Sequence, residues 1–85
     1  MNDGWEENTL EFFPNPVADI LFVKPIPTAD KSIFEISDVS GRILLKGEME
    51  SSATTEIPVG NLLPGFYFIS IHQDGKVRTA FFIAS

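Results

Sequence analysis

The stretch Leu62-Leu63-Pro64-Gly65-Phe66-Tyr67, followed by Ile69 and Ile71, carries the strongest indication of the fold of this 85-residue chain. A Pro-Gly turn leads into a strand whose alternate positions are apolar, which is typical of a half-buried β-strand. In immunoglobulin-like sandwiches a tyrosine at the start of a late strand hydrogen-bonds to the upstream backbone and packs its ring into the core. We therefore expect Gly65 to adopt a positive φ in the turn, and Tyr67 to hold such a corner.

Short apolar runs recur along the chain at intervals of about 8 to 12 residues, with turn residues between them, and this pattern predicts an all-β sandwich or barrel. No segment has apolar residues at helical spacing over a useful length. Seven strands in a chain of this size favour an immunoglobulin-like sandwich of two antiparallel sheets over a closed barrel. The predicted strands cover residues 10–13, 20–24, 33–37, 42–46, 54–59, 66–73 and 76–83.

Turn residues separate these strands. Pro14-Asn15-Pro16 ends the first strand, because two of its three residues have no amide hydrogen to donate. Asp38-Val39-Ser40-Gly41 has the composition of a type I turn, and Gly47 is expected to end the strand that follows it. Pro58 places the fifth strand at a sheet edge, and Asp74-Gly75 predicts a two-residue hairpin between the last two strands.

Strand alternation assigns side chains to the two faces of each sheet. Tyr67, Ile69 and Ile71 share the side that we expect to face the core. The other side of the strands is not uniformly polar, and its large apolar residues are either covered by loops and the N-terminal tail or form a patch for a neighbouring domain or second copy. The expected core also contains Leu21, Val23, Phe34, Ile36, Val77, Thr79, Phe81 and Ile83, and the expected outward residues are Ile20, Phe22, Phe66, Phe68 and Phe82.

Composition excludes several classes of function. The formal net charge of −6, from 12 acidic and 6 basic residues, disfavours nucleic acid and anionic membrane surfaces as partners. With one histidine and no cysteine the chain has none of the usual zinc sites, and we expect no metal and no cofactor. Residues 1–9 are predicted to be an acidic tail or linker, and residues 10–85 a single domain.

The candidate catalytic residues do not form a catalytic site. Ser70, His72 and Asp74 alternate on one side of a strand, but neighbours on that side lie roughly 6.6 Å apart, beyond the reach of a nucleophile and its base. We therefore expect His72 to be a solvated residue near the end of its strand. Asp3, Glu6 and Glu7 could bind calcium loosely, although a solvated tail is the favoured interpretation. The sequence indicates a protein that is not an enzyme.

Three motifs in order resemble one family. They are Phe12-Phe13-Pro14-Asn15-Pro16-Val17, then Ile36-Ser37-Asp38-Val39-Ser40-Gly41-Arg42, then Leu62-Leu63-Pro64-Gly65-Phe66-Tyr67. Together they make residues 12–85 similar to the C-terminal sorting domain of type IX secretion cargo, as found in Bacteroidetes. Family members often finish with a basic residue, whereas this chain has Ala84-Ser85 after its last apolar run.

The resemblance implies a non-catalytic domain at the end of a larger exported protein. It implies recognition by the outer-membrane secretion machinery, cleavage by a surface sorting protease, and delivery of an N-terminal passenger through the periplasm and outer membrane to the cell surface or medium. Candidate sorting-motif residues are then Pro14, Asn15, Pro16, Asp38, Gly41, Arg42, Gly65 and Tyr67, with Lys76 and Arg78 as the basic residues nearest the end.

The sequence leaves open both the way in which the machinery would recognise the domain and an alternative function. The domain would present its last strands to the machinery either by strand addition or through outward aromatic side chains, which could also support weak self-association. The alternative function is an immunoglobulin-like spacer or adhesion module of a larger surface protein or hydrolase.

Overall fold

The computed structural model describes residues 10–25, 31–50, 52–73 and 75–85, and within them the chain is all β, with seven strands. None of the described residues belongs to a helix long and apolar enough to cross a membrane. The strands are β1 (Phe12–Phe13), β2 (Ile20–Val23), β3 (Ser32–Ser37), β4 (Ile43–Met49), β5 (Thr55–Pro58), β6 (Gly65–Gln73) and β7 (Lys76–Ala84). Each lies where the sequence predicts a strand, and the predicted tail over residues 1–9 is outside the described residues.

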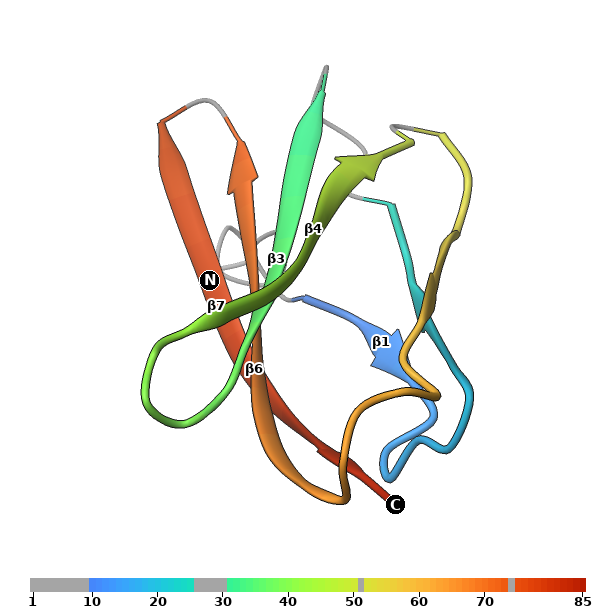
Figure 1. Cartoon of the computed structure of the whole chain (residues 1–85). Coiled ribbons are helices and arrows are strands. Elements are labelled where there is room, and N and C mark those ends of the chain that lie inside the picture. Colours follow the sequence, from blue (N-terminus) through green and yellow to red (C-terminus); the bar gives the residue numbers. More distant parts are fainter. Residues whose placement is uncertain (1–9, 26–30, 51, 74) are drawn as a thin grey trace, which may run out of the picture.

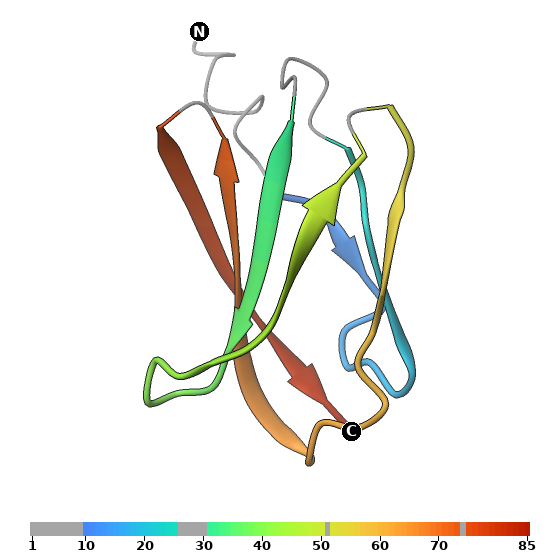
Figure 2. The same ribbon diagram turned by 45° about the horizontal axis from the view of Figure 1, so that its top comes forward.

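The strands form two antiparallel sheets packed face to face (Figures 1 and 2), so the predicted two-layer sandwich is confirmed. One sheet has three strands in the order β1-β2-β5, and the other has four in the order β4-β3-β6-β7. The strand β5 lies at a sheet edge, as Pro58 predicts, because proline cannot donate to a second ladder. In the four-stranded sheet the two edge strands are β4 and β7, and β7 is the last strand of the described chain.

The core lies between the two sheets. Leu21, Val23 and Ile36 are fully buried there, as predicted, together with Ile69 and Ile71 of β6. The remaining members of the buried cluster are Val17, Met49, Ile57, Val59, Tyr67, Phe82 and Ala84. This single cluster of apolar side chains comes from both sheets, and its burial between them stabilises both layers.

The predicted faces of β7 are wrong. Phe82 is fully buried, whereas Val77 and Phe81 are 56% and 58% exposed, Thr79 is exposed, and Ile83 is half-buried. The cause is the register of β7 against β6, in which Tyr67 lies opposite Phe82 and Gln73 opposite Lys76. Residues that lie opposite one another share a face, so the odd-numbered core residues of β6 match even-numbered residues of β7.

The strand β4 also differs from its prediction, because it continues through Gly47 to Met49. Gly47 lies opposite Phe34, and a Cβ atom at Gly47 would come within 2.8 Å of the Phe34 ring. The ring therefore covers the glycine and packs partly against the core, where an ordinary side chain would not fit. Glycine here serves close packing within a strand rather than a turn.

Candidate functional site

The Pro14-Asn15-Pro16 motif lies beside the end of β7, although 68 positions separate Asn15 from Ile83. Val17 forms a parallel bridge with Ala84, its backbone N–H donates to the Ile83 carbonyl at 2.8 Å, and the Ser85 N–H donates to the Val17 carbonyl at 2.9 Å. We call these contacts of residues 15–17 with residues 83–85 the C-terminal clasp.

The side chain of Asn15 completes the clasp. Its Oδ1 atom accepts a hydrogen bond from the backbone N–H of Ile83 at 2.9 Å. Prolines on both sides of Asn15 have no amide hydrogen to donate to β7, so a regular backbone ladder does not continue here, and the Asn15 side-chain oxygen is the group that accepts from the Ile83 N–H. Val17, which follows Pro16, is fully buried beside the end of β7. The motif thus fixes the chain's last residues to the three-stranded side of the sandwich.

The predicted tyrosine corner is present at the same end of β7. The Tyr67 hydroxyl donates to the Leu63 carbonyl, and the Tyr67 ring stacks on Phe82 with ring centroids 5.8 Å apart. Phe12 also packs edge-on against Phe82, with ring centroids 6.3 Å apart. Gly65, where β6 begins, has φ +152°, so the predicted positive φ is confirmed. The corner therefore joins the 62–65 loop to the last strand through the core.

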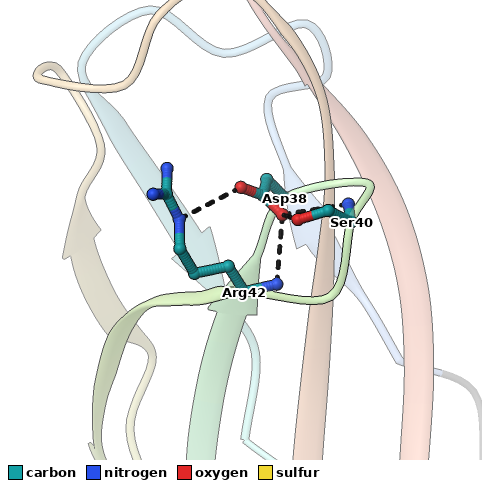
Figure 3. A network of polar contacts seen from close by, with 3 residues as sticks. All are labelled: Asp38, Ser40 and Arg42. Carbon is teal, nitrogen blue, oxygen red and sulfur yellow. Dashed lines mark hydrogen bonds and ion pairs between the residues drawn. The ribbon is translucent and has the colours of Figure 1, made fainter.

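The central motif forms a closed polar turn between β3 and β4 (Figure 3). The Oδ1 atom of Asp38 accepts hydrogen bonds from the Ser40 N–H at 2.9 Å, the Ser40 hydroxyl at 2.6 Å and the Arg42 N–H at 3.1 Å. The Arg42 Nε atom lies 3.4 Å from Asp38 Oδ2, and the Gly41 N–H donates to the Asp38 carbonyl, with Gly41 at φ +93°. The predicted turn is therefore confirmed.

These contacts favour the charged form of Asp38. The hydrogen bond from the Ser40 side chain, supported by the backbone amides of Arg42 and Ser40 and by the Arg42 charge, lowers the pKa of Asp38 below its ordinary value of 3.8. The carboxylate is engaged by its own turn, which is a structural role. Nothing in this geometry leaves it poised for acid–base chemistry.

The ten candidate residues do not form one cluster. The clasp, the tyrosine corner and the Asp38 turn all lie at the same end of the sandwich, the end that carries the C-terminus (Figure 2). Lys76 and Arg78 lie toward the other end of β7, opposite Gln73 and Ile71 of β6, with Lys76 exposed and Arg78 half-buried. A recognition element that uses both groups would have to extend along the length of β7.

Large apolar side chains gather on the outward face of the four-stranded sheet. Phe68 lies opposite Phe81 on β7 and opposite Ser37 on β3, which in turn lies opposite Ile43 on β4. Phe66 packs edge-on against Phe81, with ring centroids 6.3 Å apart. We call this group the outer aromatic patch, and the exposed fractions of its members are Phe66 58%, Phe81 58%, Ile43 51% and Phe68 37%.

The sequence predicted part of this patch. Phe66 and Phe68 face outward as expected, whereas Phe81, which the sequence pattern places in the core, also faces outward because it lies opposite Phe68 in the register of β7 against β6. On the other sheet Ile20 is also outward, at 38% exposed, and Phe22 is half-buried and stacked on Phe13. The signal that finds Phe81 is the two-residue spacing between Gln73 and Lys76, which fixes the pairing of every later residue.

Polar residues on the same face pair with one another. Glu35 contacts both His72, with Oε1 3.0 Å from Nε2, and Lys46, with Oε2 3.6 Å from Nζ. The Ser70 hydroxyl lies 3.1 Å from the Thr79 hydroxyl. His72 is thus partly covered rather than fully solvated, and it contacts a carboxylate instead of Ser70, while Asp74 lies outside the described residues. Among the described residues no group of three or more His, Cys, Asp or Glu side chains could hold a metal ion.

Comparison with known families agrees with this architecture. Residues 11–85 match the model of a family described as "Secretion system C-terminal sorting domain". The resemblance drawn from the three motifs is therefore confirmed over nearly the whole chain. No curated protein matches the chain.

Proposed function

The chain belongs to the secretion-system C-terminal sorting-domain family, and from this premise we propose that it directs an attached passenger across the outer membrane by presenting β6 and β7 to the secretion machinery. Membership implies a type IX sorting signal, a non-catalytic role, and export to the cell surface or medium. We assign recognition to the end of β7 and to the outer aromatic patch beside it.

The observation that carries this proposal is the exposure of the patch. Phe66 and Phe81 are each 58% exposed and touch each other on the two final strands, with Ile43 and Phe68 beside them. Large aromatic side chains on an otherwise acidic domain are expected to bind a partner, because aromatic residues are enriched in the buried centres of interfaces. The clasp holds the last residues in place next to this face, which presents the strand end and the aromatic side chains together.

The partners follow from the same assignment. The outer-membrane secretion machinery would contact the patch and the end of β7, and the surface sorting protease would act between passenger and domain. The alternative role, a spacer or adhesion module, requires no recognition of these two strands. Substitutions confined to the patch therefore separate the two functions.

A reporter with an export leader, fused to residues 10–85 in a host with type IX secretion, should reach the cell surface. Deleting residues 79–85 should leave it in the periplasm, but this deletion also removes Phe82 from the core. The sharper variant is Phe66→Ser with Phe81→Ser, because both side chains are exposed and the core stays intact. The matched control is Ile20→Thr on the outward face of the other sheet.

We expect the double variant to be folded by circular dichroism, to lose surface delivery, and to accumulate in the periplasm, while the control is delivered normally. Equal surface delivery of the intact fusion, the deletion and the double variant would contradict a sorting role and favour the spacer.

A further inference from the structure

The outer edge of β7 offers backbone groups to a further strand. Both the N–H and the carbonyl of Ile83 point away from β6, because they bond to Asn15 and Val17. Backbone direction alternates along an antiparallel strand, so the N–H and carbonyl groups of Phe81, Thr79 and Val77 point to the same side. No described residue outside β6 pairs with these three residues.

The other sheet edges are less suited to pairing. Strand β1 has two residues, β5 contains Pro58, and β4 carries Lys46 and Glu48 on its outward face. Short edges, prolines and charges of this kind discourage edge-to-edge association. By contrast, β7 is nine residues long, its two charged residues Lys76 and Arg78 lie on the inner side, opposite Gln73 and Ile71, and three of its outward side chains are Val77, Thr79 and Phe81.

The open part of this edge is self-complementary. The clasp occupies it from Ile83 onward and the turn at Gly75 ends it at the other side, so its free groups are centred on Thr79. A twofold axis at Thr79 places Val77 of one copy opposite Phe81 of the other, and Thr79 opposite Thr79. Each of these pairs exchanges two backbone hydrogen bonds, and the Val77–Phe81 pair forms twice, joining side chains that are 56% and 58% exposed in the single domain.

We propose that a second copy of this chain pairs antiparallel with the edge of β7, about Thr79, to make one continuous eight-stranded sheet. On the inner side Arg78 of one copy lies opposite Ala80 of the other, so no two like charges are directly opposed. The two Arg78 side chains are diagonal neighbours, and each copy carries a net charge of −6. The dimer is therefore weak at low salt and strengthens as salt screens the repulsion.

Sedimentation of the full 85-residue chain over a concentration series tests the proposal. We expect the average mass to rise toward that of a dimer with concentration, and to rise further at higher salt. Thr79→Pro should abolish the rise, because proline cannot donate to the second copy. The N–H lost from Thr79 is not part of the ladder with β6, and the Ser70–Thr79 hydroxyl contact that is also lost is exposed, so the melting temperature of the dilute protein should change little. Phe81→Lys, which removes an outward contact without touching the backbone, should also abolish the rise.

Crosslinking locates the axis. The chain has no cysteine, so Thr79→Cys carries a single thiol on the outward face, and a short bismaleimide should capture it as a covalent dimer. The matched control is Thr54→Cys, exposed in the loop before β5 and far from the edge, which should remain monomeric at the same concentration.

A monomeric mass at every concentration would overturn the proposal. So would association that persists in both Thr79→Pro and Phe81→Lys, since a different surface would then be responsible. Because these measurements use purified protein without secretion machinery, their outcome is independent of whether the domain sorts a passenger.

Discussion

The Oδ1 atom of Asn15 accepts a hydrogen bond from the backbone N–H of Ile83 at 2.9 Å, and this contact ties the first loop of the domain to its last strand. Backbone bonds between Val17 and residues Ile83 and Ser85 lie beside it. The motif near the start of the domain and the end of its final strand therefore form one structural unit.

Replacing Asn15 tests this unit. Asn15→Ala should lower the free energy of unfolding by about 1 kcal/mol, because the Ile83 N–H loses its acceptor. Asn15→Asp keeps an acceptor oxygen and should retain most of the stability. Chemical denaturation of both variants measures the difference, and hydrogen exchange of the Ile83 amide should accelerate in Asn15→Ala alone. Equal stability and exchange in the two variants would show that the contact contributes nothing.

The tyrosine corner makes a separate prediction. Tyr67→Phe removes the hydroxyl that donates to the Leu63 carbonyl but keeps the ring that stacks on Phe82. The free energy of unfolding should therefore fall by about 1 kcal/mol, the usual net contribution of one hydrogen bond. Thermal melting measures it, and an unchanged melting temperature would remove the corner's energetic role.

Substitution of Gly65 should destabilise the domain through its backbone conformation. A Cβ atom there would meet no atom within 4 Å, so any cost of Gly65→Ala comes from the backbone, at φ +152°, and not from a clash. Alanine at such a φ should destabilise the domain by more than about 1 kcal/mol. The control is Gly60→Ala, where a Cβ atom meets only ordinary contacts, the nearest at 3.5 Å, and φ is not in the positive region. Denaturation curves that coincide for the two variants would contradict the backbone explanation.

Local turn chemistry explains why much of this structure could be predicted. The Asp38 turn and the Tyr67 corner depend on residues at most five positions apart, and their side chains have few alternative partners. The clasp could not be predicted in the same way, because Asn15 and Ile83 meet only after both sheets have formed. The faces of β7 are an intermediate case. The two-residue spacing between Gln73 and Lys76 contains the register, and applying it places Phe82 inside and Phe81 outside.

Gly47 and Phe34 should be coupled. Gly47→Ala brings a Cβ atom within 2.8 Å of the Phe34 ring, so the ring must move from its place over β4. We expect a loss of about 1–3 kcal/mol, as for overpacking elsewhere in well-packed proteins. Phe34→Leu shortens the opposing side chain, and in that background Gly47→Ala should cost much less. A double-mutant cycle by chemical denaturation measures this coupling, and additive effects of the two substitutions would argue against it.

The Asp38 turn should make part of the domain's stability depend on acid pH. Hydrogen bonds from Ser40 and Arg42 lower the pKa of Asp38 in the folded state below the 3.8 of the free side chain. Between the folded and unfolded pKa values of Asp38, the folded state therefore binds fewer protons than the unfolded chain. The contribution of Asp38 to the free energy of unfolding is complete at pH values above the unfolded pKa. It is lost as pH falls below 3.8 through the lower, folded value. Unfolding curves collected between about pH 6 and pH 2 should show this loss in the native chain but not in Asp38→Asn.

Ser40→Ala is the control for the cause of this effect, because the Ser40 hydroxyl makes the largest favourable contribution to the lowered pKa of Asp38. It should reduce the acid-dependent loss without abolishing it, since the amides of Ser40 and Arg42 still donate to the carboxylate. If the native chain and Asp38→Asn lose the same amount of stability at acid pH, the pH dependence belongs to other carboxylates. If Ser40→Ala does not change this loss of stability, the backbone amides are the main stabilising contacts of the turn.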